Sequence, residues 1–125
     1  MVYPSKIQTG WHLIAEITVP FLQNLEESRM VVSAFEAALQ KAELQVLRLV
    51  EHDFEPKGFT AMALLSESHA SLHTWPEHDL VAFDVFSCTS RDKPEICLHH
   101  FVKNLGGEVR ELKIIPRHLN PWRNT

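Results

Sequence analysis

The sequence is organised around residues 64–77, LLSESHASLHTWPE, a short apolar run that ends in a dense set of reactive side chains. Within it the hydroxyl of Ser68 lies between an acid and histidines, and His73 follows five residues later. A thiol, Cys88, ends the next apolar stretch. Because three proton-handling groups fall between residues 68 and 88, this part of the chain predicts a catalytic site that the remaining residues hold in place.

The bulk composition is that of one ordinary globular domain. The chain has 125 residues, of which 45% are hydrophobic and 22% charged, and its formal net charge is -4. That length allows one core, and the acidic balance offers no electrostatic footprint for nucleic acid or an anionic membrane. Residues 1–6 lack the apolar core of a signal peptide and no eighteen-residue window is apolar, so we expect a cytoplasmic protein without membrane or nucleic-acid partners.

Two cysteines, Cys88 and Cys97, are present in a chain with no sign of an oxidising compartment. We therefore expect free thiols rather than a disulfide. Cys97 falls in a helical apolar stripe, which predicts a core position, whereas Cys88 follows a strand and is a candidate reactive thiol.

The remaining elements follow from hydrophobic periodicity and breaker residues. Apolar residues at three- and four-residue steps predict helices from Asn24 to Ala42 and from Pro94 to Leu105, the second ended by Gly106-Gly107. β-Branched, aromatic or alternating residues predict five strands, at 10–19, 44–50, 59–65, 79–88 and 109–115.

In this order of elements residues 66–78 form no strand. Residues 1–9 are predicted to form an arm, and residues 116–125 a polar tail. The near-continuous apolarity of residues 61–65 predicts burial on both faces, or a helix over one face and a partner sheet over the other. The short connections predict an α+β fold, a two-layer sandwich in which one largely antiparallel sheet carries two helices on one face.

Five motifs stand out along the chain: Glu67-Ser68-His69, His73-Thr74-Trp75-Pro76-Glu77, residues 84–88 (DVFSC), residues 52–58 (HDFEPKG) and residues 12–16 (HLIAE). Taken together, they resemble the bacterial and archaeal S-adenosylmethionine decarboxylase proenzymes over most of residues 10–115. The resemblance implies a cytoplasmic, self-cleaving, pyruvoyl-dependent lyase of polyamine (spermidine) synthesis that works as a homodimer of two-chain protomers.

The resemblance implies that the chain cuts itself between Glu67 and Ser68, giving a β chain of residues 1–67 and an α chain of residues 68–125. In this chemistry Ser68 Oγ attacks the Glu67 carbonyl carbon, the amide becomes an ester, and a base removes the α-proton of Ser68 so that the ester leaves by β-elimination. The dehydroalanine that remains hydrolyses to a pyruvoyl group. His73 matches the processing base of the family.

The other site residues are carried over by position in the same way. Thr60 stands where the family usually has a serine that supports processing, and Cys88 matches the proton donor in decarboxylation. The pyruvoyl carbonyl forms a Schiff base with the substrate amine and acts as the electron sink. Phe54 and Trp75 match aromatic residues around the substrate, able to stack on adenine and attract a sulfonium cation, and Glu77 matches an acidic residue near the ribose.

The chain departs from the family pattern at Phe59 and Ala61, where small residues are usual. We expect these side chains to crowd the site, which leaves L-ornithine or L-arginine as alternative substrates for the same scaffold. A non-processing paralogue that regulates an active relative is a further alternative. A zinc site formed by His69, His73, His78 and Cys88 is not expected, because the spacing is poor and no paired-cysteine knuckle exists.

Overall fold

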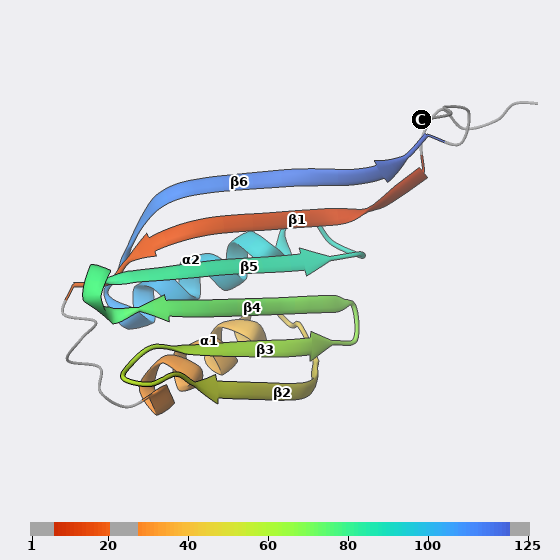
Figure 1. Ribbon diagram of the computed structural model, residues 1–125. Helices are drawn as coiled ribbons and strands as arrows, with labels where there is room; N and C mark the ends of the chain where they lie inside the picture. Colours follow the sequence, from red (N-terminus) through yellow and green to blue (C-terminus); the bar gives the residue numbers. More distant parts are fainter. Residues whose placement is uncertain (1–6, 21–27, 121–125) are drawn as a thin grey trace, which may run out of the picture.

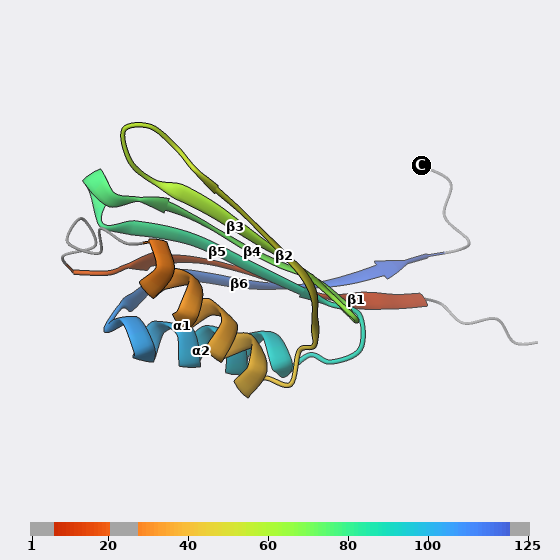
Figure 2. The ribbon, with the colours of Figure 1, turned by 90° about the horizontal axis from the view of Figure 1, so that it is seen from below.

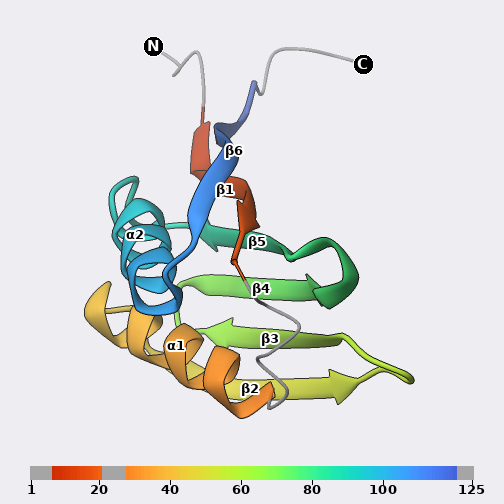
Figure 3. The same ribbon diagram turned by 90° about the vertical axis from the view of Figure 1, so that its left-hand side faces the viewer.

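Six strands form a single sheet, and two helices lie side by side on one of its faces. The computed structural model describes residues 7–20 and 28–120. The strands lie in the order β2-β3-β4-β5-β1-β6, and each neighbouring pair is antiparallel (Figure 1). Figures 2 and 3 show both helices on the same side of the sheet, so the predicted α+β sandwich is confirmed. The elements are β1 (Ile7–Thr18), α1 (Ser28–Lys41), β2 (Val46–Asp53), β3 (Phe59–Leu65), β4 (Ser68–Trp75), the 3-10 helix η2 (Pro76–His78), β5 (Leu80–Ser87), α2 (Lys93–Leu105) and β6 (Glu108–Leu119).

The core fills the space between the sheet and the helices. Three aromatic rings meet there: Phe83 of β5 stacks on Phe101 of α2 with centroids 5.0 Å apart, and Phe35 of α1 packs edge-on against both. Full burial of one such side chain contributes about 1.5–3 kcal/mol to the free energy of unfolding. The sequence predicted all three as apolar positions, and the structure confirms them as core.

Helix α2 matches its prediction at both ends. Pro94 lies in the first turn, and Gly106 ends the helix in the left-handed conformation with φ 67. Cys97 is fully buried on the helix face that contacts the core, and burial raises the pKa of its thiol to about 12. Cys97 is thus a structural residue, as expected, while Cys88 is a free and exposed thiol.

Residues 68–75 form β4, a strand that the predicted order of elements lacks. Ala70 and Leu72 are buried in the core, whereas the side chains that alternate with them face away from the helices. This period of two is the pattern of a half-buried strand. The prediction missed it because three of the alternating residues, His69, Ser71 and His73, are not among the β-branched and aromatic residues that are enriched in strands.

Strands β1 and β6 are both longer than predicted. β1 begins at Ile7 instead of residue 10, and β6 continues to Leu119, beyond the predicted range 109–115. Pro116, which lacks an N–H group, is accommodated because β6 lies at the edge of the sheet.

Gly10 lies inside β1, although the strand predicted from the sequence begins at this residue. The pairing of β1 with β6 is irregular between Gln8 and Gly10, and Gly10 has φ 155. A Cβ atom at this position would lie 2.7 Å from the carbonyl oxygen of Ser87. Glycine is therefore required by a bulge and a close backbone approach.

Two further predictions change in detail. The predicted N-cap of the first helix, Asn24, lies outside the described residues. β2 covers Val46–Asp53, later than the predicted range 44–50. Among the described residues no helix is both long enough and apolar enough to cross a membrane.

Strand β3 is buried on one face only, so burial of residues 61–65 on both faces is wrong within one chain. Ala61, Ala63 and Leu65 are buried, whereas Met62 and Leu64 are 51% and 54% exposed on the other face. The alternative prediction was a helix layer over one face and a partner sheet over the other. The helices cover one face, and no partner sheet covers the other within the described part of the chain.

Candidate active site

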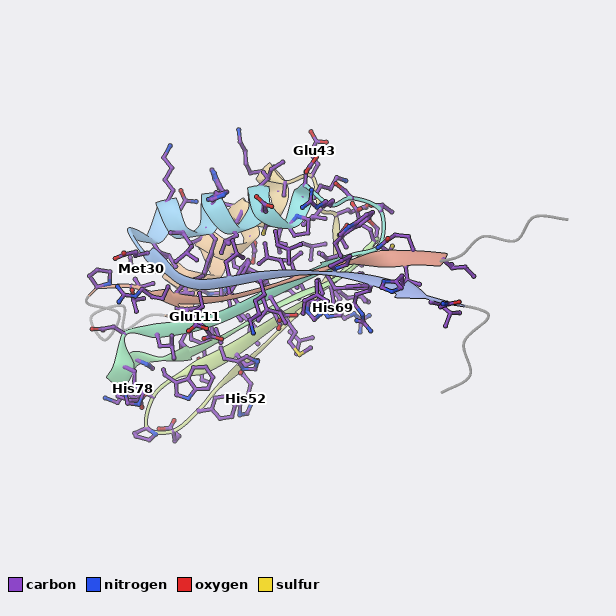
Figure 4. All side chains as sticks on the ribbon, turned by 90° about the horizontal axis from the view of Figure 1, so that it is seen from above. Met30, Glu43, His52, His69, His78 and Glu111 are labelled. Carbon is purple, nitrogen blue, oxygen red and sulfur yellow. The ribbon has the colours of Figure 1, made fainter. Side chains whose placement is uncertain are left out.

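Three of the predicted site residues, Thr60, His73 and Trp75, lie on the open face of the sheet, the face that carries no helix. In Figure 4 Glu43 lies on the helix side, while His52, His69 and His78 lie on the opposite side of the sheet. Residues directly paired across antiparallel strands share a face. The pairings of β4 with β5 and of β5 with β1 therefore align side chains of three strands in rows across this open face.

One group of predicted residues, here called the serine end, consists of Glu67, Ser68 and Cys88. It lies where the β3–β4 turn meets the end of β5. Ser68 has φ 143, a conformation that residues with a side chain rarely adopt. The backbone N–H of Cys88 donates a hydrogen bond to the carbonyl oxygen of Glu67 at 3.0 Å. The Glu67–Ser68 peptide bond thus combines a strained residue with a carbonyl that is already polarised by a donor.

A second group, here called the aromatic end, consists of Phe54, Thr60, His73, Trp75 and Glu77. It lies at the opposite end of the sheet, near the β2–β3 loop and η2. Thr60 Oγ1 is 2.7 Å from His73 Nδ1, and the rings of His73 and Trp75 are 6.0 Å apart. Phe54 and Trp75 are 51% and 42% exposed. This end is a set of accessible aromatic and polar side chains rather than a closed pocket.

The two ends are far apart within one chain. Ser68 is the first residue of β4, and His73 follows it on the same strand, which pairs with β3 without irregularity. At about 3.3 Å per residue, five residues span roughly 16 Å. A general base acts within about 3 Å of the proton it removes. His73 therefore does not reach Ser68 of its own chain in this conformation.

Between the two ends lies a polar cluster that the sequence reasoning missed. His12 Nε2 is 2.8 Å from Asp84 Oδ2, and His69 Nε2 is 3.8 Å from the same oxygen. The hydroxyl of Ser71 donates to the other oxygen of Asp84. These residues belong to stretches singled out in the sequence, but only the pairing of β1, β4 and β5 brings their side chains together.

The polar cluster is also the place where a metal ion could be held. The ligand atoms of His12, His69 and Asp84 lie within 4.8 Å of one another, and no other such group occurs in the described part of the chain. Of the four residues weighed as a zinc set from the sequence, only His69 belongs to it. The other three, His73, His78 and Cys88, are not part of this group.

A shallow hollow joins the polar cluster to the aromatic end. Its volume is ≈ 220 Å³, and His12, Glu16, His73 and Asp84 contribute to its lining. The open face is therefore concave beside the Thr60–His73 pair, where a ligand or another surface has room to enter.

Phe59 and Ala61 do not crowd the open face, contrary to the sequence-based expectation. Their side chains are 7% and 0% exposed and belong to the core. Because successive side chains of a strand point to opposite faces, the residue between them, Thr60, faces the site instead. The departures from the family pattern at these two positions affect packing under the sheet.

The structure adds one residue at the serine end that no motif indicated. Lys93, the first residue of α2, forms an ion pair with Glu67 at 2.7 Å. The two residues are far apart in the sequence, so no local pattern could predict the contact.

Comparison with known proteins identifies one family. The family model of S-adenosylmethionine decarboxylase matches residues 11–118. An "S-adenosylmethionine decarboxylase proenzyme" of Prochlorococcus marinus (strain MIT 9211) is 35% identical over 108 residues, 86% of this chain and 88% of its own length. A proenzyme of the same name from Oceanobacillus iheyensis is 32% identical over 112 residues, 90% of this chain and 89% of its own.

A solved structure supports the fold. The crystal structure of the adenosylmethionine decarboxylase from Aquifex aeolicus superposes with a TM-score of 0.76 at 24% identity, covering 95% of this chain and 99% of the other. The family match begins within β1, ends within β6 and includes every element between them, and so it includes the serine end, the polar cluster and the aromatic end. This chain belongs to the S-adenosylmethionine decarboxylase family.

Proposed function

We propose that this chain is a self-processing, pyruvoyl-dependent decarboxylase that converts S-adenosylmethionine to its decarboxylated form for polyamine synthesis. The observation that carries the proposal is the geometry of the Glu67–Ser68 bond, with φ 143 at Ser68 and the Glu67 carbonyl bonded to the N–H of Cys88. The names of the relatives supply the substrate. They give no support to ornithine or arginine.

Self-cleavage would use the serine end as follows. Ser68 Oγ attacks the carbonyl carbon of Glu67, the C–N bond breaks, and the amine of residue 68 is released as the ester forms. The N–H of Cys88 donates to the oxygen on which negative charge develops, the role of an oxyanion hole. Loss of the α-proton then expels the Glu67 carboxylate, and water converts the dehydroalanine to a pyruvoyl group with release of ammonia.

The residues at the serine end fit the cofactor that this cleavage would create. The pyruvoyl group, once formed at residue 68, supplies an electron sink for the loss of carbon dioxide from an amino acid. Cys88 follows the end of β5, beside the turn that carries Ser68, and its side chain is exposed. A thiol in this position can deliver a proton to the substrate carbon.

We further propose that each active site is shared between two chains of a homodimer. The base His73 and the bond it must serve are roughly 16 Å apart in one chain. A two-fold axis running between two facing sheets, across the strands near Ser71, reverses the strand direction and brings His73 of the partner subunit to the level of Ser68 along the strand. The serine end of one chain and the aromatic end of the other would then form one complete site.

The open face has the surface that such a dimer requires. Facing sheets pack about 10 Å apart through interdigitating side chains, and large exposed apolar surfaces are uncommon on monomers. Exposed apolar side chains flank the polar cluster on the open-face rows of the sheet. They are Val50, Met62, Leu64, Trp75 and Ile115.

Substrate recognition would depend on the aromatic end. Phe54 and Trp75 present flat, exposed faces that can stack on a purine and attract a sulfonium cation. Glu77 on η2 is an exposed acid that can accept hydrogen bonds from ribose hydroxyls. A basic amino acid offers neither a ring nor a ribose to these groups.

The test combines mass and activity on the purified protein. We expect intact mass to show two pieces, 1–67 and 68–125, with a pyruvoyl group at the amino end of the second. We expect carbon dioxide to be released from S-adenosylmethionine but not from ornithine or arginine. Ser68→Ala should give one uncut, inactive chain, whereas the nearby Ser66→Ala should be cut normally.

Three outcomes would overturn parts of this proposal. An uncut chain that decarboxylates S-adenosylmethionine would remove the pyruvoyl group from the mechanism. Activity on ornithine or arginine alone would change the substrate. An uncut and inactive wild-type chain would favour the regulatory paralogue.

A further inference from the structure

The side chain of Glu67 makes contacts that the cleavage chemistry does not by itself require. Its Oε1 atom is 2.7 Å from Lys93 Nζ, and the hydroxyl of Ser87 donates to Oε2 at 3.5 Å. The Glu67 and Lys93 side chains are only 11% and 29% exposed. A carboxylate this far removed from water needs a counter-ion, and Lys93 is the one that the described residues provide.

Lys93 is itself held in place by other contacts. Its backbone N–H donates to Ser90 Oγ at 3.3 Å, and its Nζ also donates to the carbonyl oxygen of Glu43 at 3.2 Å. Glu43 lies on the helix side of the molecule, as Figure 4 shows. The ammonium group is thus fixed between the start of α2, the α1–β2 connection and the β3–β4 turn, and it can serve as a rigid anchor for Glu67.

We propose that Lys93 is a positioning residue for self-cleavage, an inference that rests on the proposed function. Glu67 is held at two points, its carboxylate by Lys93 and its carbonyl oxygen by the N–H of Cys88. Two fixed points on one residue restrict rotation of the carbonyl that Ser68 attacks. Positioning of this kind matters because a misplacement of about 1 Å can slow a reaction about 100-fold.

The same ion pair has a second role once the bond is cut. Glu67 then ends the 1–67 piece and carries two carboxylates, one from its side chain and one from the broken bond. Lys93 belongs to the 68–125 piece, so its contacts with Glu67 and with the Glu43 carbonyl join the two pieces. Lys93 therefore retains the new chain end beside the loop that carries Cys88.

The experiment follows processing in time after a pulse of cell-free synthesis, using denaturing gels and intact mass. Lys93→Met should lengthen the half-time of cleavage roughly 10- to 100-fold, and Lys93→Arg should fall between this variant and wild type. The matched control is Lys103→Met, at an exposed lysine near the other end of α2, which should process at the wild-type rate.

Hydroxylamine, which cleaves esters but spares ordinary amides, separates positioning from a general structural effect. Lys93→Met should form the ester slowly, so hydroxylamine should not speed its cleavage. His73→Ala should accumulate the ester, and hydroxylamine should cut it. A Lys93→Met chain that hydroxylamine cuts rapidly would overturn the proposal, because Lys93 would then act after the attack by Ser68.

A double-mutant cycle tests whether Lys93 acts through Glu67. If it does, Glu67→Gln combined with Lys93→Met should process no more slowly than the slower single variant. Fully additive slowing would overturn the proposal, as would an unchanged half-time for Lys93→Met with a native circular dichroism spectrum. If Lys93→Met does not fold, the half-time of Lys93→Arg is measured instead, and an unchanged half-time would overturn the proposal. Failure of the wild-type chain to cut itself would instead overturn the proposed function.

Discussion

The serine end and the aromatic end occupy the two ends of the same strand, yet they are built differently. At the serine end, Glu67 is nearly buried and is fixed by Lys93 and by a backbone donor. At the aromatic end, Phe54 and Trp75 are about half exposed, and each ring pairs with a neighbouring histidine ring. The serine end is held by contacts within the chain, whereas the aromatic end presents exposed side chains that another molecule can contact.

This difference follows from the chemistry each end would perform. Attack on a peptide bond within the chain needs fixed geometry, and a restrained turn provides it. Binding a substrate needs accessible apolar and polar groups, which exposed side chains beside a hollow provide. In the proposed dimer the two ends are complementary halves of one site, and variants can show whether the halves that cooperate belong to one chain or to two.

The largest effect is expected from mixing two inactive variants. Ser68→Ala and His73→Ala chains should each stay uncut alone, because every site lacks one group. When they are expressed together, mixed dimers should have one intact site, so roughly a quarter of all sites should process if pairing is random. Denaturing gels with differently tagged chains should show fragments from the His73→Ala chain alone. No fragments in the mixture would mean that Ser68 and His73 act within one chain.

The next effect separates processing from turnover at the serine end. Cys88→Ala should still cut itself, because the N–H that contacts the Glu67 carbonyl belongs to the backbone. Loss of the proton donor should lower kcat by about 10²- to 10⁴-fold. Steady-state assays on the processed variant measure this loss, with Thr89→Ala as the neighbouring control. Unchanged kcat would assign protonation to another group.

A smaller effect is expected on assembly through the surface between the two ends. Met62→Lys introduces a charge on the open face, and each dimer contains the change twice. Burial of a methionine contributes about 1.5–3 kcal/mol, so the dimer dissociation constant should rise roughly 100-fold or more. Met30→Lys, on helix α1, is the matched control and should leave the dimer intact. Sedimentation velocity gives both values, and an unchanged Met62→Lys dimer would exclude this face as the interface.

The smallest effect concerns substrate binding at the aromatic end. Trp75→Ala removes one stacking face, worth about 0.5–1.5 kcal/mol beyond simple burial. The KM for S-adenosylmethionine should therefore rise roughly 3- to 10-fold while the half-time of self-cleavage stays near that of wild type. A slower cleavage with an unchanged KM would mean that Trp75 acts in self-cleavage and not in substrate binding.

Much of the fold and of the chemistry could be predicted from local patterns. The stripe of α2, its end at Gly106 and the buried alternation of β5 all follow from residues close together in the chain. The motif around Ser68 and His73 indicated the family. The strand β4 was missed because His69, Ser71 and His73, which alternate with its buried residues, are not among the β-branched and aromatic residues that are enriched in strands.

The sequence by itself determined which reactive groups are present and which segments form helices. Tertiary structure alone decided that β1 lies between β5 and β6, that His12 meets Asp84, and that Lys93 meets Glu67. The physical reason is the distance along the chain over which each interaction acts. Periodicity and turn chemistry act over a few residues, whereas strand order and ion pairs depend on how distant segments bury their apolar faces against one another.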